Sequence, residues 1–216
     1  MASVVDRPGR LGLGLALVVS LLALGFAVAG RADAGLLSPS DSDSASVCDT
    51  NSQQVFLPWN DWSYYVLMPG GSFEGAHGWT LKGGAKVVTG NEPFYLTARS
   101  DKRSLYLPAG SSATTAPACF AFADWHFRFL AVRNGSGYGA LKIDVIVKSL
   151  LGIASVLDGG TIPVSSQWSP SPQVSLLLTN LGGLLGTDTI SLRFTPVGST
   201  AGFRIDDVFL DPLKGD

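Results

Sequence analysis

The sequence predicts an all-β protein, a jelly-roll β-sandwich of two antiparallel sheets, preceded by an N-terminal signal helix. The first observation is composition: the 216 residues include 26 glycines and 12 prolines, and only 15% are charged. This balance is typical of a turn-rich β domain and excludes a charge-rich disordered chain or a coiled coil. The second is that short runs rich in β-branched and aromatic residues recur between turn residues, a spacing typical of β-sandwiches. The third is that no convincing helical period follows the signal.

The N-terminus has the pattern of an export signal. Arg7 and Arg10 precede an apolar run from Leu11 to Ala29, and Ala32-Asp33-Ala34 is a small-x-small cleavage site. We therefore expect residues 1–34 to be a signal peptide and the protein to be secreted. The apolar run is also long enough for an uncleaved membrane anchor. In that case this N-terminal segment is the only contact with the membrane.

Residues 35–53 are expected to be a flexible spacer, because they are rich in serine and aspartate and contain few apolar residues. The domain itself is expected to span residues 54–216.

Cys48 and Cys119 are the only cysteines, and in an oxidising compartment an isolated pair most simply forms one disulfide. Closing a loop of about 70 residues contributes roughly 4 kcal/mol to stability. No CxxC spacing or nearby histidine points to a reactive thiol or a metal pair instead.

The strands follow from the residue pattern. We expect them, in chain order, at Gln54–Trp59, Phe94–Thr97, Ser104–Leu107, Cys119–Ala123, His126–Val132, Ala140–Ser149, Ile153–Leu157, Val174–Thr179, Thr189–Pro196 and Gly202–Leu210. Turns are expected at Asn134–Gly137 and Asp158–Gly160, where glycine permits positive φ. Leu176–Gly186 fits either a short helix or a buried loop.

Alternation is clearest in two of these segments. In 126–130, two phenylalanines share one face and His126 and Arg128 share the other. In residues 142–148, the charged residues Lys142 and Asp144 alternate with β-branched residues in the same way. Both segments are therefore expected to be central core strands.

Two motifs near the ends of the domain carry a resemblance to a known family. The first is Pro69-Gly70-Gly71-Ser72-Phe73-Glu74 with Gly78-Trp79 behind it, and the second is the strand Phe203–Leu210, which reads FRIDDVFL. Together they resemble the opening and closing motifs of carbohydrate-binding modules of families 4, 9 and 22 and the wider galactose-binding-like jelly rolls. The resemblance implies a jelly-roll fold and a non-catalytic binding function. The overall layout is also similar to a group of secreted bacterial proteins, which supplies no activity.

The same resemblance implies a structural calcium ion. In these modules the opening glutamate and a closing aspartate commonly hold Ca²⁺, and the matching positions are Glu74 and Asp206, with Asp207 adjacent. Calcium takes six to eight oxygen ligands, so loop carbonyls would complete the site. By strict alternation Asp207 shares a face with Phe203, Ile205 and Phe209, and Asp206 shares one with Val208 and Leu210. The alternative is that Glu74 caps a turn or pairs with Arg204 and no metal binds.

Aromatic residues give the candidate ligand surface, because flat rings stack on the apolar faces of sugars. A polar loop contains Trp59, Trp62, Tyr64 and Tyr65. Trp168 is expected to be exposed as well, because its neighbours are serine and proline residues. The alternative is that the loop aromatics cover one open end of the sandwich. Trp79 is expected in the core.

Catalysis and nucleic-acid binding find no support. His77 and His126 are isolated, and no GxSxG or HExxH motif is present, so we expect no enzyme. The net charge of −2 excludes a basic nucleic-acid binder.

The favoured function is binding of carbohydrate or cell-envelope glycan. The alternative is a structural or protein-interaction protein of the envelope that packs through Val174–Leu185.

Overall fold

The computed structural model describes residues 51–119, 125–149, 152–176, 187–198 and 202–211. The predicted signal peptide, most of the predicted spacer, Cys48 and residues 177–186 lie outside these ranges. Within them, no helix is both long enough and apolar enough to cross a membrane.

The described residues form a short 3-10 helix, η1, at Leu57–Trp59, and a series of strands. In chain order the strands are β1 (Val66–Leu67), β2 (Thr80–Lys82), β3 (Lys86–Thr89), β4 (Arg103–Leu107), β5 (Ser112–Thr114), β6 (Ala118–Cys119), β7 (Trp125–Arg133), β8 (Ala140–Ser149), β9 (Ala154–Pro163), β10 (Ser169–Pro170), β11 (Val174–Leu176), β12 (Thr187–Val197) and β13 (Phe203–Leu210).

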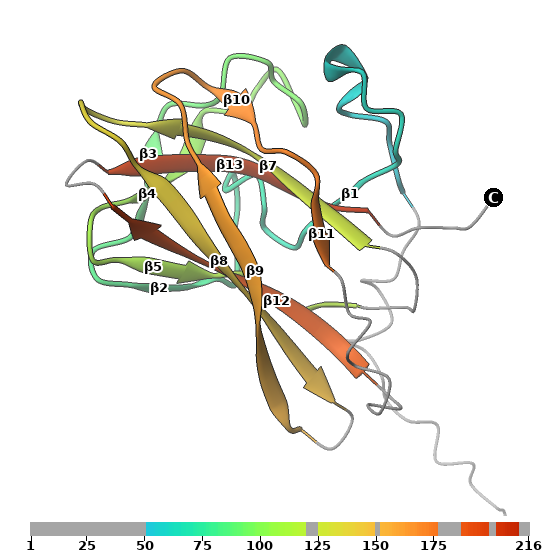
Figure 1. The fold of residues 1–216 in the computed structure, drawn as a ribbon. Coiled ribbons are helices and arrows are strands. Elements are labelled where there is room, and N and C mark those ends of the chain that lie inside the picture. The colour runs from blue at the N-terminus through green and yellow to red at the C-terminus, as the bar shows by residue number, and fades with distance from the viewer. Residues whose placement is uncertain (1–50, 120–124, 150–151, 177–186, 199–201, 212–216) are drawn as a thin grey trace, which may run out of the picture. The chain divides into compact units, whose positions relative to one another are not determined.

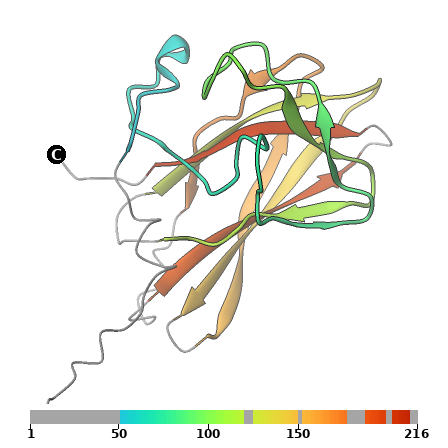
Figure 2. The ribbon, with the colours of Figure 1, turned by 180° about the vertical axis from the view of Figure 1, so that it is seen from behind.

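These strands build two facing antiparallel sheets (Figures 1 and 2). One, here named the β13 sheet, has the order β10-β7-β13-β4-β3, with β1 also paired to β13 and β11 to β7. The other, the β12 sheet, has the order β2-β5-β12-β8-β9, with β6 also paired to β12. The predicted all-β sandwich is therefore confirmed.

The core between the sheets is built by the alternation expected from the sequence. Phe127 and Phe129 of β7 have no exposed surface and belong to this core. Arg128 between them points to the opposite face of the sheet, where its guanidinium lies over the ring of Phe56. Phe129 meets Phe194 of β12 edge to face at 5.1 Å between ring centroids. Trp79 is 6% exposed and belongs to this core, as predicted.

Three expected elements are wrong. Phe94–Thr97 forms turns rather than a strand, and Gln54–Trp59 ends in η1. Asp158–Gly160 is not a turn between strands but lies inside β9, where the pairing with β8 shifts register. The two glycines accommodate that irregularity, since a Cβ on Gly159 would lie 3.0 Å from the carbonyl oxygen of Ile143.

A second apolar cluster covers the outer face of the β13 sheet. Phe56 and Tyr65 from the N-terminal segment bury Leu130 of β7 and Phe209 of β13. In Figure 1 this segment is the blue-green chain beside β13 and β1. The β13 sheet is thus covered on both sides. This second layer explains why so many aromatic residues precede the first motif.

A β-bulge interrupts β13 at the paired aspartates. Asp207 and Val208 together oppose the single residue Phe129 on β7, and Asp207 has a positive φ of 48°. Beyond the bulge Val208 and Leu210 face the core, while Phe209 faces the outer cluster. The strict alternation expected for this strand, with Phe209 on the face of Phe203, is therefore wrong.

Candidate functional site

The predicted aromatic loop, residues 59–65, lies on the outer side of the β13 sheet. Its chain direction is set where η1 ends, because Asn60 adopts the left-handed conformation with φ of 59° and donates its backbone N–H to the carbonyl of Leu57. Asparagine tolerates this conformation better than most residues. The next side chain, Asp61, is only 7% exposed and points toward the sheet rather than into solvent.

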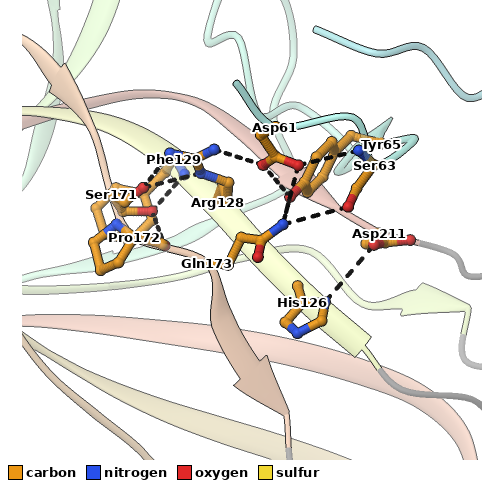
Figure 3. Close-up of polar contacts among 10 residues, drawn as sticks. All are labelled: Asp61, Ser63, Tyr65, His126, Arg128, Phe129, Ser171, Pro172, Gln173 and Asp211. Carbon is orange, nitrogen blue, oxygen red and sulfur yellow. Dashed lines mark hydrogen bonds and ion pairs between the residues drawn. The ribbon is translucent and has the colours of Figure 1, made fainter. Parts of the chain in front are cut away.

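Asp61 is the centre of a buried polar network (Figure 3). Its Oδ2 accepts hydrogen bonds from Arg128 Nη1 at 2.5 Å and from Tyr65 Oη at 2.7 Å. Its Oδ1 accepts from the Ser63 backbone N–H at 3.1 Å and from Gln173 Nε2 at 3.0 Å. The loop is therefore tied to β7 and to the connection between β10 and β11.

Arg128 completes the network from the sheet. Its Nε and Nη2 both donate to the carbonyl oxygen of Ser171, at 2.9 and 2.7 Å, and its guanidinium lies 4.5 Å from the ring centroid of Phe56. Burial works to raise the pKa of the Asp61 carboxyl, but hydrogen bonds from Tyr65, Arg128 and Ser63 outweigh it and hold that pKa below its usual value. Asp61 and Arg128 therefore form a buried, charged pair at neutral pH.

The network divides the predicted ligand residues into two groups. Trp62 is 68% exposed and Tyr64 56% exposed, whereas Tyr65 is buried at 1%. Trp59 is half-buried and meets Phe94 edge to face at 4.9 Å. Only Trp62 and Tyr64 of this loop present their rings to solvent, and Tyr65 and Trp59 serve packing.

Trp168, the other predicted ligand residue, is half-buried against the outer cluster. The guanidinium of Arg204 lies 5.8 Å from the centroid of its ring, within the range of a cation–π contact. This side chain therefore packs on the same outer face of the β13 sheet, with part of its ring accessible.

The predicted metal residues lie in two different places. Glu74 Oε1 accepts the backbone N–H groups of Lys102 and Arg103, both at 2.6 Å, so it caps the start of β4. Asp206 and Asp207 are 0% and 1% exposed, and the contacts of Glu74 do not include them. Arg204 instead donates from Nε to Ser104 Oγ at 2.9 Å.

Glu92 is the acidic residue that joins the two aspartates, and the sequence reasoning missed it. Glu92 is fully buried, its backbone N–H donates to Asp206 Oδ2 at 3.4 Å, and its Oε1 accepts from the Leu96 N–H at 2.9 Å. Thr97 Oγ1 donates to Asp207 Oδ1 at 3.1 Å. The sequence signal was present, because the chain contains only two glutamates and Glu92 is one of them.

These buried acids have displaced pKa values. Burial, followed by the charge of Asp207, raises the pKa of Asp206 to about 9, and burial together with the charge of Glu92 raises that of Asp207. Asp207 Oδ2 is buried without a hydrogen-bond partner. Among the described residues, no three acidic, histidine or cysteine side chains are already arranged to hold one ion. Glu92, Asp206 and Asp207 therefore offer carboxylate oxygens to a cation, but their side chains do not form a preformed three-ligand site.

Comparison with known proteins finds similarity only at the level of structure. No protein-family model and no curated protein matches the chain. The CBM22-1 xylan-binding domain of Xyn10C from Paenibacillus barcinonensis is 18% identical, with a TM-score of 0.46 over 67% of this chain and 93% of that one. TmCBM61, solved in complex with beta-1,4-galactotriose, is 16% identical, with a TM-score of 0.44 over 68% and 98%.

A protein of another kind matches equally well. The enzymatically active domain of tailspike protein 4 from bacteriophage CBA120 is 19% identical, with a TM-score of 0.46 over 67% of this chain and 21% of that one. Because every one of these matches is distant, the fold described here rests on the strand pairing of this chain itself.

Proposed function

We propose that this domain is a secreted, non-catalytic binding module for carbohydrate or cell-envelope glycan, and that Trp62 and Tyr64 contact the ligand. The observation that carries the proposal is their exposure, 68% and 56%, on a loop fixed by the buried Asp61 network. A fixed loop loses little conformational freedom on binding, so more of the contact energy appears as affinity. Aromatic rings supply apolar contact area for the C–H faces of a sugar.

Polar groups beside these rings support the same ligand class. Ser63 lies between the two aromatic residues, and Gln173 Nε2 lies 3.3 Å from its Oγ. Gln173 is itself exposed, so amide and hydroxyl groups accompany the rings on one surface. Hydroxyl-rich ligands need both kinds of contact, because the polar groups fix orientation while the rings bury area.

The three acids beside the bulge of β13 are not placed for glycoside hydrolysis. A glycosidase requires two carboxyl groups that reach a bound sugar, roughly 5 to 9.5 Å apart. Glu92, Asp206 and Asp207 are 0 to 1% exposed, so they do not contact a ligand on the surface. These three buried acids therefore support no hydrolytic role.

Replacing Trp62 with alanine is expected to weaken ligand binding by about thirtyfold, equivalent to ~2 kcal/mol, with little change in melting temperature. The loss arises because the indole is exposed and contributes contact area to the ligand rather than to the fold. A glycan array on residues 35–216 identifies the ligand, and titration calorimetry measures its affinity.

Tyr138→Ala is the matched control, because Tyr138 is also 68% exposed but lies on the loop between β7 and β8. It should bind as the unaltered protein does. Full affinity in Trp62→Ala, or equal losses in both variants, would contradict the proposed contact surface. An array without any bound glycan would instead favour the envelope-protein alternative.

The export signal supports a second expectation, that Cys48 and Cys119 are joined. Secretion exposes the pair to an oxidising compartment, and the bridge would tie the predicted spacer to β6, where Cys119 pairs with Thr189 of β12. Peptide mapping of the secreted protein without reduction should recover one cross-linked peptide. Recovery of both residues as free thiols would contradict the pairing.

We also propose that Ca²⁺ binds beside the bulge of β13, through Asp207 and Glu92, with Asp206 adjacent. The partnerless Asp207 Oδ2 and the raised pKa values support it, since a divalent cation would satisfy the oxygen and take the place of bound protons. Backbone carbonyls and water would supply the remaining oxygen ligands. Bound there, the ion would supply structural rather than catalytic chemistry.

A further inference from the structure

The outer face of the β12 sheet is polar across β2, β5, β12 and the first half of β8, unlike the covered outer face of the β13 sheet, while Ile146 and Val156 lie farther along the same face. Strand register aligns two rows of outward side chains across it. The first row is Thr80, Thr114, Arg193, Asp144 and Asp158, and the second is Lys82, Ser112, Thr195, Lys142 and Thr161. Each row crosses β2, β5, β12, β8 and β9 in turn. Five adjacent strands therefore present hydroxyl and charged groups in register.

A groove of about 620 Å³ lies over the parts of these rows that belong to β2, β5, β12 and β8. The turn Gly110–Ser111 before β5 also lines it, and hydroxyl groups of Ser112, Thr114 and Thr195 lie along it. None of its lining residues is aromatic. A ligand here is held by charge and hydrogen bonds rather than by ring stacking, so the groove is chemically distinct from the loop of Trp62 and Tyr64.

The groove carries an excess of positive charge. Asp144 accepts from Lys142 Nζ at 2.8 Å and lies 3.7 Å from Arg193 Nη1, so one carboxylate serves two cations. Lys82, on β2, is exposed and makes no ion pair within the described residues. Lining residues thus include three cations and one anion, although the whole chain has a net charge of −2. Asp158, which follows Asp144 in the first row, adds a second anion beside the groove. The local excess of positive charge is therefore that of one cation, and it favours an anionic ligand.

We propose that this groove binds an acidic polysaccharide, with uronate carboxylates on Lys82 and Arg193 and sugar hydroxyls on the serine and threonine side chains. Carboxylates form charge-assisted hydrogen bonds with both kinds of cation, and arginine can bind one bidentately. A row of hydroxyl groups on adjacent strands matches a repeating chain better than a single small anion. The site is separate from the proposed function at Trp62, since the two lie on the outer faces of different sheets.

The test compares oligogalacturonate with a neutral galacto-oligosaccharide of the same length, by titration calorimetry at low and high salt. The acidic oligosaccharide should bind at least tenfold more tightly, and its affinity should fall as salt screens the charges. Lys82→Gln should weaken it about fivefold, as expected for one exposed charge contact. Lys86→Gln is the matched control, because Lys86 is an exposed lysine on β3 of the other sheet.

The outcomes separate this site from the aromatic loop. Equal affinity for both oligosaccharides, or equal losses in Lys82→Gln and Lys86→Gln, overturns the groove proposal. Binding of the acidic chain that depends on Lys82 and survives Trp62→Ala supports it, even if no glycan needs Trp62. Glycan binding that depends on Trp62 alone supports the proposed function and overturns the groove.

Discussion

Replacing Asp61 with alanine is expected to destabilise the domain by about 3–5 kcal/mol, the range for breaking a buried ion pair. The side chains of Arg128 and Asp61 are only 9% and 6% exposed. Without the carboxylate, the guanidinium would stay buried with a single carbonyl partner, Ser171. Tyr65 Oη and Gln173 Nε2 would each lose an acceptor as well.

Urea unfolding measures this loss, and a double-substitution cycle isolates its cause. Arg128→Met alone should also be destabilising, because it leaves the carboxylate buried without its cation. Asp61→Leu combined with Arg128→Met should be more stable than the sum of the single effects predicts, since no unpaired charge remains. Additive losses, or an Asp61→Ala variant within 1 kcal/mol of the unaltered protein, would contradict the role assigned to the pair.

The same pair sets the response to acid. The pKa of Asp61 is lower in the folded than in the unfolded chain, so its contribution to stability is present above the ordinary aspartate pKa. That contribution is lost as the pH falls through the folded pKa. Asp61→Asn should therefore show a weaker loss of stability below about pH 4 than the unaltered protein.

The long strands could be predicted from the sequence because their side chains alternate. β8 has the expected bounds, and β7, β12 and β13 differ from expectation by one or two residues. The strands β2, β3 and β5 were missed, since each has four residues or fewer. A run that short is too brief for alternation to be recognised, and long-range pairing rather than local sequence places it in a sheet.

The candidate sites were less predictable, because they depend on residues far apart in the chain. Asp61, Arg128 and Gln173 lie together because the N-terminal segment packs on β7, although Arg128 and Gln173 are 67 and 112 residues from Asp61 in the chain. The alternation rule also failed at Asp207, where one extra residue in the bulge reverses the faces of all later side chains. The sequence therefore pointed to Asp206, Asp207 and the loop of residues 59–65 as candidates, while the place of Glu92 emerged from its contacts and the groove from the strand register.

The final prediction concerns the buried acids beside this bulge. In a chelator, the domain should lose several kcal/mol of stability as the pH rises from the ordinary aspartate pKa of 3.8 toward about 9. The sign follows from linkage: the pKa values of Asp206 and Asp207 are higher in the folded state, so over this range the folded chain holds protons that the unfolded chain has released. Ionising the buried pair at high pH removes the stability that those protons supply.

Calcium should reverse this trend, because the cation takes the place of the protons and binds more strongly as the carboxyls ionise. The melting temperature should therefore rise with calcium concentration more at pH 8 than at pH 5. Asp207→Asn should be less sensitive to pH in chelator and should lose the calcium response. Glu74→Ala should lower the melting temperature, because Lys102 and Arg103 lose their acceptor, and yet keep that response. Identical melting curves in calcium and chelator at pH 8 would contradict the metal, and a pH-independent curve in chelator would contradict the raised pKa values.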